Sequence, residues 1–165
     1  MRYSIWIIPP EPVFSELGTT IHSLAAEYGG PVFEPHITIL GSVDGELKQI
    51  NRAVDSAIQN LGRLTLALGP ISFGTTYYQS VLARVESTAQ LLQLNLNIKK
   101  QLGLENNAYH PHVSLIYGDH DMTIREEIAA KVKLTNAAFI AETIAVVEDT
   151  PDPSEWSAAA SFHLR

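Results

Sequence analysis

Two short segments of the sequence each place a histidine two positions before a hydroxyl residue. Residues 35–39 read PHITI and residues 111–115 read PHVSL, almost half the chain apart. A single His-x-Thr pattern in a strand usually marks only a partly exposed pair of side chains. Two copies behind proline, each with a β-branched residue and an aliphatic residue at matching places, instead indicate a shared chemical role.

The residue types in these segments suit the hydrolysis of a phosphate ester. Neutral imidazole can take a proton from water near pH 7, and imidazolium can give one to a leaving group. His36 and His112, on opposite sides of a substrate, could do both in one in-line displacement. The hydroxyls of Thr38 and Ser114 could donate to non-bridging phosphate oxygens as charge builds there. This chemistry needs no metal ion, and a strained cyclic phosphodiester with a tethered leaving oxygen fits it well.

Alternation along a strand predicts that each histidine shares a face with its hydroxyl residue. Residues i and i+2 of a strand point the same way, so His36 lies in step with Thr38, and His112 with Ser114. The intervening aliphatic residues then point into the core. If the two strands lie side by side, two imidazoles and two hydroxyls converge in one cleft.

The elements that must position these side chains follow from hydrophobic periodicity and from glycine and proline breaks. Strands are expected at residues 2–8, 36–40, 63–73, 77–86, 112–117, 136–148 and 156–164. Helices are expected at residues 13–28, 45–61, 88–102 and 123–132. Both halves of the chain then have the order strand, helix, motif strand, helix, strand. We predict an α+β fold, a single domain over residues 1–165 with two pseudo-symmetric lobes that carry the motifs at 36–38 and 112–114.

Composition narrows the classes of partner. The chain has 165 residues, a formal net charge of −7 and no cysteine, which excludes disulfides, zinc thiolate sites and thiol nucleophiles. No basic cluster extends beyond Lys99 and Lys100, so an extended nucleic acid is not expected to bind. A small phosphorylated molecule needs only a few well-placed donors and remains possible as a ligand.

The apolar run at residues 5–8 is too short for a signal peptide and for the roughly 20 residues of a membrane span. We therefore expect a cytoplasmic protein that binds no membrane. We also expect a monomer whose ligand is a small cyclic nucleotide.

Four stretches resemble the 2H phosphoesterase superfamily, and within it they are most similar to the plant-type cyclic nucleotide phosphodiesterases. They are YSIW at residues 3–6, GPVFEPHITI at 30–39, YHPHVSLIYG at 109–118, and the pattern EDT…EW…A…FHL near the end. The resemblance covers essentially the whole chain. It implies a bilobal fold with two antiparallel sheets facing a central, water-filled cleft and with helices outside.

The resemblance also implies an activity and a set of site residues. The activity is hydrolysis of ADP-ribose 1″,2″-cyclic phosphate to ADP-ribose 1″-phosphate, and of nucleoside 2′,3′-cyclic phosphates to 2′-phosphates. By motif match the catalytic residues are His36 and His112. The implied substrate-binding residues are Thr38, Ser114, Tyr117 and Trp6.

The two aromatic residues in this set, Trp6 and Tyr117, are expected at the cleft for different reasons. Trp6 lies in step with Ser4, and it could stack on a base or a ribose at the cleft wall or be an ordinary core residue. Tyr117 follows Ser114 by three positions, so strict alternation would turn it away from the cleft. Gly118 would permit a bulge that re-aims it. Tyr117 is therefore expected at the cleft on the resemblance alone.

The other histidines give a weaker signal. His110 and His112 have a spacing that could place two metal ligands on one strand face, and His36 and His120 could complete a zinc site. The first motif has Glu34 where the second has His110, so we expect no metal ion and no cofactor. His22 and His163 are expected to be surface or rim residues. Tyr77 and Tyr78 lie at a hairpin and could gate the cleft, but exposed aromatic residues are common in turns, and we expect ordinary turn residues here.

The sequence thus predicts a metal-independent cyclic phosphodiesterase acting on small nucleotides. One alternative is an RNA 2′,5′ ligase-like or RNA-end cyclic phosphodiesterase, which should need basic residues along the cleft. A second alternative is a non-catalytic nucleotide-binding module. Which histidine is the base, and which cyclic phosphate is the physiological substrate, stay open at this point.

Overall fold

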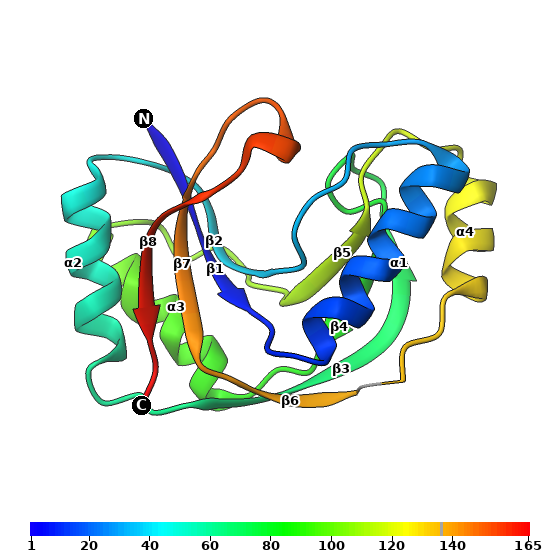
Figure 1. Ribbon diagram of the computed structural model, residues 1–165. Coiled ribbons are helices and arrows are strands. Elements are labelled where there is room, and N and C mark those ends of the chain that lie inside the picture. The colour runs from blue at the N-terminus through cyan, green and yellow to red at the C-terminus, as the bar shows by residue number, and fades with distance from the viewer. Residues whose placement is uncertain (136) are drawn as a thin grey trace.

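A single curled antiparallel sheet carries both motif strands (Figure 1). In the computed structural model, which describes residues 1–135 and 137–165, eight strands lie in the order β6-β3-β4-β5-β2-β1-β7-β8. The strands are β1 (Arg2–Ile8), β2 (Ile37–Asp44), β3 (Leu64–Phe73), β4 (Val81–Val85), β5 (His112–Ile116), β6 (Ala138–Ala141), β7 (Thr143–Glu148) and β8 (Ala158–His163). The predicted α+β class is confirmed.

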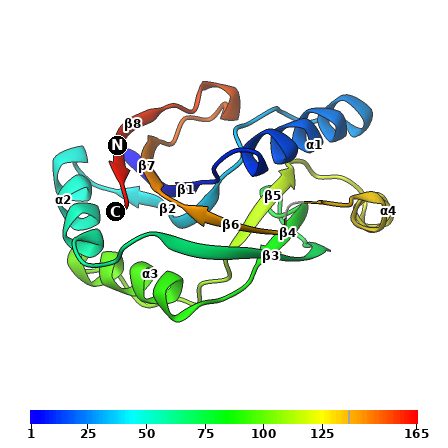
Figure 2. The ribbon, with the colours of Figure 1, turned by 60° about the horizontal axis from the view of Figure 1, so that its bottom comes forward.

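Helices cover the outside of the sheet, as Figures 1 and 2 show. They are α1 (Val13–Tyr28), α2 (Leu47–Ile58), α3 (Ala89–Leu102) and α4 (Met122–Lys131), with a 3₁₀ turn at Pro153–Glu155. None of these helices, in the part of the chain that the structure describes, is long and apolar enough to cross a membrane.

The sheet divides into two lobes where the motif strands meet. The first lobe contains β2, β1, β7 and β8, and the second contains β5, β4, β3 and β6. The lobes join where β2 pairs with β5 at Ile37 and Val113. The two sheets expected from the sequence are therefore halves of one sheet. Helices α2 and α3 pack on the first lobe, and α1 and α4 pack on the second, so each lobe combines segments from both halves of the chain.

Buried aliphatic residues on one face explain why the motif strands hold their register. Ile37 and Ile39 are at most 1% exposed, and Val113 and Leu115 are fully buried in the core. Each such aliphatic side chain contributes about 1.5–3 kcal/mol when removed from water. A one-residue slip would move this apolar set to the cleft face. The core face therefore fixes the polar face on which the histidines and hydroxyls lie.

Helix α3 shows how local signals place an element against a motif strand. The Thr88 hydroxyl accepts a hydrogen bond from the Leu91 amide at the N-terminus, and Gly103, at φ 65°, ends the helix in the left-handed region. The buried Asn95 side chain donates a 2.7 Å hydrogen bond to the Ile39 carbonyl. This bond ties α3 directly to β2.

The predicted strand at residues 77–86 is wrong at its beginning. The strand β4 starts only at Val81, and residues 77–80 form a loop. The carbonyls of this segment have partners outside a regular ladder. The Tyr78 carbonyl accepts from the Ser114 hydroxyl at 2.7 Å, and the Tyr77 carbonyl accepts from the amide of Gly118, beyond the end of β5, at 3.1 Å.

The predicted strand at residues 136–148 is two strands on opposite lobes. The chain leaves β6 in the second lobe, passes Glu142 and enters β7 in the first lobe. The nearly continuous apolar run gives no sign of such a crossing, although β6 alternates between exposed and buried residues and β7 is buried at residues 144–147. The predicted first residue of this strand, Asn136, lies outside the described residues. The last predicted strand begins at Ala158 and not at Trp156, which follows the 3₁₀ turn.

Candidate active site

A cavity of about 300 Å³ lies beside the junction of the two lobes. Its walls come from β1 and β2 of the first lobe, from β5 and the 77–80 loop of the second, and from the loop that follows β7. All the side chains that the sequence indicated line this cavity: Trp6, His36, Thr38, His112, Ser114 and Tyr117. The structure thus brings the two distant motifs together.

The two motif histidines are held in the same way. Nδ1 of His36 lies 2.7 Å from the Glu34 carbonyl oxygen, and Nδ1 of His112 lies 2.8 Å from the His110 carbonyl oxygen. A carbonyl can only accept, so Nδ1 carries the proton in both rings. Nε2 of each neutral imidazole is then the nitrogen that can accept a proton.

The proline in each motif explains this shared geometry. Pro35 and Pro111 stand between each histidine and its carbonyl partner. Proline fixes its own φ and keeps the residue before it extended. The carbonyl two positions back is thereby held where it can accept from Nδ1. The repeated Pro-His pair is thus a device that sets the tautomer of the imidazole.

His36 is the more deeply placed of the two histidines. It is 6% exposed, and its ring stacks on Trp6 with centroids 3.6 Å apart and planes 11° apart. Burial lowers the pKa of His36 to about 4, the carbonyl of Glu34 opposes this shift, and repulsion from His112 adds to it. His36 is therefore a neutral imidazole at neutral pH in the free protein.

Trp6 has its ring engaged within the protein. It is 3% exposed, with one face against His36 and an edge-to-face contact with Trp156 at 5.6 Å. Trp6 lines the cavity, as predicted, and it orients the imidazole of His36. Stacking of Trp6 on a substrate stays a prediction.

His112 has a more open setting. It is half-buried, and burial lowers the pKa of its imidazole, with the positive charges of Arg84 and His110 adding to the shift and the His110 carbonyl opposing it. Arg84 lies directly beside His112 in the β4–β5 pairing. The two histidines are thus inequivalent, since one is enclosed by aromatic rings and the other lies nearer to solvent and to fixed positive charge.

The hydroxyl of Ser114 is supported by the second lobe. It donates a 2.7 Å hydrogen bond to the Tyr78 carbonyl in the 77–80 loop. Tyr109 plays a comparable part for the first motif, since its hydroxyl donates to the Thr38 carbonyl at 2.9 Å. Each motif strand is therefore fastened at its hydroxyl position by a contact from another element. A hydroxyl can rotate, so Ser114 can turn from Tyr78 to a bound anion.

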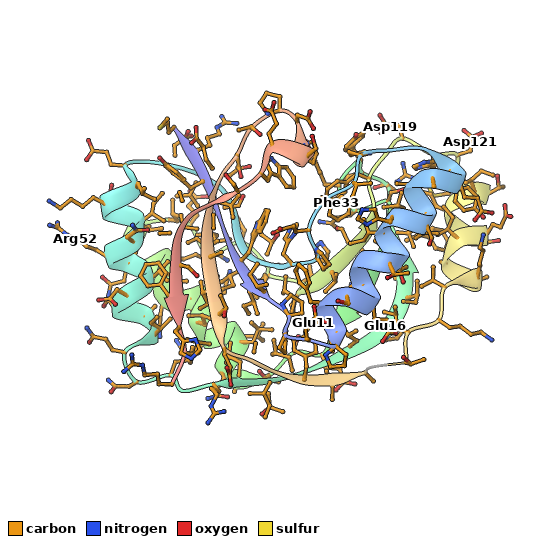
Figure 3. All side chains as sticks on the ribbon, viewed as in Figure 1. Glu11, Glu16, Phe33, Arg52, Asp119 and Asp121 are labelled. Atoms are coloured by element: carbon orange, nitrogen blue, oxygen red, sulfur yellow. The ribbon has the colours of Figure 1, made fainter. Side chains whose placement is uncertain are left out.

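Tyr117 lies at the cavity because the strand has already ended. Its ring stacks on Phe33 with centroids 3.8 Å apart, and Figure 3 shows Phe33 between the two lobes. The strand β5 stops at Ile116, so alternation no longer applies, and Gly118 has a φ of 149°. Burial raises the pKa of the Tyr117 hydroxyl, with the charge of Tyr78 adding to the shift and a hydrogen bond with Ser114 opposing it. Tyr117 is thus a protonated donor at neutral pH.

Several cavity residues escaped the sequence analysis. Tyr78 was expected to be an ordinary turn residue, but it lines the cavity, and the same cavity is lined by Ser4, Ser42, Asp149 and Trp156. Most of them come from loops or from the far end of β7, so no repeat marks them. Ser4 carries a signal because it lies in step with Trp6 on β1, and Asp149 and Trp156 fall within the pattern EDT…EW that resembles the family.

The remaining histidines lie elsewhere. His22, His163 and His110 are exposed, whereas Nε2 of His120 lies 3.1 Å from the carbonyl oxygens of Tyr28 and Gly29. Among residues 1–135 and 137–165, no group of three or more histidine, aspartate or glutamate side chains could hold a metal ion.

The sequence of this chain is similar to proteins that are described as cyclic phosphodiesterases or cyclic-nucleotide phosphodiesterases. The profile of the family described as cyclic phosphodiesterase-like protein matches residues 1–164. A cyclic phosphodiesterase of Arabidopsis thaliana is 26% identical over 118 residues, which cover 71% of this chain and 65% of that protein. A 2′,3′-cyclic-nucleotide 3′-phosphodiesterase of Yarrowia lipolytica is 27% identical, covering 72% of this chain and 74% of that protein. The match thus spans slightly less than two thirds of the Arabidopsis relative.

Solved structures share the fold at low sequence identity. The protein TT0787 of Thermus thermophilus has a TM-score of 0.70 at 19% identity, covering 100% of this chain and 98% of that chain. Escherichia coli LigT, in complex with 3′-AMP, has a TM-score of 0.65 at 14% identity, covering 99% of this chain and 97% of that chain. These similarities support the bilobal α+β architecture over the full length of the described chain.

Proposed function

The chain belongs to the family of cyclic phosphodiesterase-like proteins, and we propose on this premise that it hydrolyses cyclic phosphodiesters of small nucleotides with His36 and His112 as general base and general acid. The 2H phosphoesterase resemblance is thereby confirmed at the level of the family. One observation carries the proposal. Both imidazoles, held through Nδ1 by equivalent carbonyls, line one cavity together with Thr38 and Ser114.

The proposed substrates are nucleoside 2′,3′-cyclic phosphates and ADP-ribose 1″,2″-cyclic phosphate. In a 2′,3′-cyclic phosphate, the water oxygen bonds to phosphorus while the bond from phosphorus to O3′ breaks. One imidazole takes a proton from the water and the other gives a proton to O3′, leaving a 2′-phosphate. Thr38 and Ser114 donate to the non-bridging oxygens, where negative charge grows in the transition state.

The inequivalent surroundings of the histidines favour one assignment of roles. His36, whose pKa is lowered to about 4, is neutral and ready to accept a proton from water. His112 is half-buried, so it becomes imidazolium more easily when an anionic phosphate binds beside it. We therefore assign His36 as the base and His112 as the acid.

This assignment predicts an acidic optimum for kcat/KM. The base must be neutral, so kcat/KM rises as pH increases through about 4. The acid must be protonated, so kcat/KM falls as pH increases through the pKa of His112, which lies below the ordinary 6.5. A pH–rate series with a cyclic nucleotide checks the shape of the curve. A profile that only rises between pH 5 and 8 would contradict the assignment.

Removal of either motif hydroxyl is expected to lower kcat and to leave KM nearly unchanged. We expect Thr38→Val and Ser114→Ala each to lower kcat by about 10²-fold, because each removes a donor to the charge that builds in the transition state. KM should change by less than about threefold, since the ground-state phosphate loses little. Thr38→Ser is the matched control and should retain most of the activity. Steady-state kinetics that show the loss in KM alone would argue against this role.

The proposed function is tested by a substrate panel run with and without EDTA. We expect turnover of 2′,3′-cyclic mononucleotides and of ADP-ribose 1″,2″-cyclic phosphate in chelator, with ³¹P NMR locating the product phosphate. Faster turnover of an RNA oligomer with a cyclic end would favour an RNA-end enzyme. Binding of a 2′-nucleotide without turnover of any cyclic form would favour a non-catalytic module and overturn the proposal.

A further inference from the structure

A fixed carboxylate lies in the same cavity as the catalytic histidines. Asp149 follows the last residue of β7, and its backbone amide donates to the Arg2 carbonyl at 3.0 Å, which prolongs the ladder with β1. The Ser4 hydroxyl donates to Oδ1 of Asp149 at 2.6 Å, and the Ser42 hydroxyl donates to Oδ2 at 3.1 Å. Both carboxylate oxygens are therefore held by hydrogen bonds from two strands, β1 and β2.

The serines that hold this carboxylate leave no hydrogen-bond donor for a ligand. Each hydroxyl has one proton, and each proton goes to the Asp149 carboxylate, which is a stronger acceptor than the neutral carbonyl that Ser114 contacts. The Ser42 amide is also committed, since it donates to the Ser4 hydroxyl at 3.2 Å. What remains toward the cavity is a set of oxygen lone pairs and a negative charge. This part of the cavity can accept hydrogen bonds, and it repels phosphate.

The backbone conformation of β1 and β2 places Ser42 against Ser4 and Asp149. The β1–β2 pairing shifts register between Tyr3 and Ile5, opposite the segment that contains Ser42. Ser42 adopts a φ of 52°, a conformation that costs energy for a residue other than glycine. The bulge and this conformation together bring the Ser42 amide and hydroxyl onto Ser4 and Asp149.

The cluster of Ser4, Ser42 and Asp149 lies two residues along β1 from the residue that contacts His36. Ser4 precedes Trp6 by two residues on the same face of β1, which is about 6.6–6.8 Å along a strand. Trp6 stacks on His36. A nucleotide whose phosphate lies at the histidines would therefore reach the cluster with its nucleoside part.

Two aromatic rings flank this region. The Trp156 indole donates from Nε1 to the Thr150 carbonyl at 2.9 Å, which fixes the ring beside Asp149. The Tyr78 ring, from the other lobe, is 6.3 Å from the Trp156 ring at an interplanar angle of 30°. Two van der Waals contacts of about 3.5 Å each separate rings that sandwich a planar group. The observed centroid spacing is shorter than these two contacts together, so the two tilted rings must move slightly apart to sandwich a planar ligand.

We propose that Asp149 reads the nucleobase of the bound cyclic nucleotide by accepting hydrogen bonds from its exocyclic amino group. The proposal rests on the proposed function, whose substrate it specifies further. A cytosine or guanine amino group would donate to the carboxylate. The carbonyl of uracil would meet it as a second acceptor, and hypoxanthine lacks the 2-amino group of guanine. The site therefore selects bases by an amino group at the edge and not by ring size.

Two substrate pairs and the Asp149→Asn variant test this proposal. The pairs are the 2′,3′-cyclic phosphates of cytidine and uridine, and those of guanosine and inosine. In the wild type we expect the amino-bearing member to have a kcat/KM about 10- to 100-fold higher, the range for a hydrogen bond to a charged group. In Asp149→Asn the preference should fall to within about threefold or reverse, because the amide can also donate.

Several outcomes would overturn the proposal. It fails if the wild type shows no preference within either pair, or if Asp149→Asn leaves the preference unchanged. It also fails if Asp149→Asn slows 1-O-methylribose 2′,3′-cyclic phosphate, which has no base, as much as the cytidine substrate, since Asp149 would then act on the ribose. The matched control is Asp119→Asn, an exposed carboxylate beyond β5 (Figure 3), which should keep the wild-type preference.

A binding measurement separates this proposal from the proposed function. Calorimetric titration with 2′-CMP and 2′-UMP reports base reading without any turnover. A preference for 2′-CMP that Asp149→Asn removes supports base reading even in a protein that hydrolyses neither cyclic substrate. Equal binding of the two products by an active wild type overturns base reading and leaves the phosphodiesterase proposal standing. A thermal midpoint of Asp149→Asn close to the wild type shows that the variant is folded.

Discussion

Replacing either motif histidine by glutamine is expected to lower kcat/KM for a cyclic nucleotide by about 10³-fold or more, within the range of general acid–base catalysis. His36→Gln removes the proposed base for water, and His112→Gln removes the proposed acid for the leaving oxygen. Because the two rings act in one displacement, the double variant should be little slower than either single variant. Steady-state kinetics on the purified variants measures each loss.

His22→Asn is the matched control for these variants. His22 is an exposed histidine on α1 that does not line the cavity, and its ring contacts only the Gly18 carbonyl among the hydrogen bonds described. We expect wild-type activity from it. A loss below tenfold for His36→Gln or His112→Gln, in protein with a native melting curve, would show that the imidazoles do not carry the reaction.

The second large effect concerns stability and centres on the buried guanidinium of Arg125, which is 3% exposed. Its Nε donates to the His120 carbonyl at 2.8 Å, its Nη1 to the carbonyls of Gly74 and Thr76, and its Nη2 to the Gly118 carbonyl at 3.3 Å. One side chain from α4 thus joins the loop after β3 to the loop after β5. The first of these loops continues to Tyr78, which supports Ser114.

We expect Arg125→Met to lower the free energy of unfolding by about 3–5 kcal/mol, because it leaves one buried and three partly buried hydrogen bonds to carbonyls without a donor. For a chain of this size the thermal midpoint should fall by about 10 °C. Arg125→Lys keeps the charge but loses the fork of donors, so its loss should be intermediate. Thermal and urea unfolding, followed by circular dichroism, provide the comparison.

Arg63→Met is the control for the arginine variants. Arg63 forms a surface pair with Glu142 at 3.1 Å, in which the two side chains are 58% and 40% exposed. Such pairs contribute about 0–1 kcal/mol, so the midpoint should move little. The free energy of unfolding of Arg125→Met could instead lie within about 1 kcal/mol of the wild-type value, which is no more than the loss of a surface pair. That result would show that the guanidinium does not organise the two loops.

The motif residues could be predicted because their spacing obeys strand geometry. His36 with Thr38 and His112 with Ser114 follow the two-residue period, and the aliphatic residues between them are buried as that period requires. The order of elements could be predicted for the same reason, since helices and strands leave periodic patterns. Periodicity is a local property, however, and it does not report which lobe an element joins.

The remaining site residues depend on contacts between segments far apart in the chain. Asp149 meets Ser4 and Ser42 only after β7 has crossed into the first lobe. Tyr78 reaches the cavity from a loop whose first part, at Gly74 and Thr76, is bound by Arg125 of α4. No spacing in the sequence encodes either event. The buried stack of Trp6 on His36 likewise follows from side-chain packing across β1 and the start of β2.

One bound phosphate is expected to contact two imidazoles that share a tautomer. Two-bond ¹H–¹⁵N correlation of the histidine rings, recorded while a nucleoside 2′-monophosphate is titrated in, tests it most directly. We predict that His36 and His112 both carry the proton on Nδ1 in the free protein at neutral pH, and that both Nε2 resonances shift and both pKa values rise together on binding. A ligand that shifts only one ring, or a free His36 protonated on Nε2, would contradict this account.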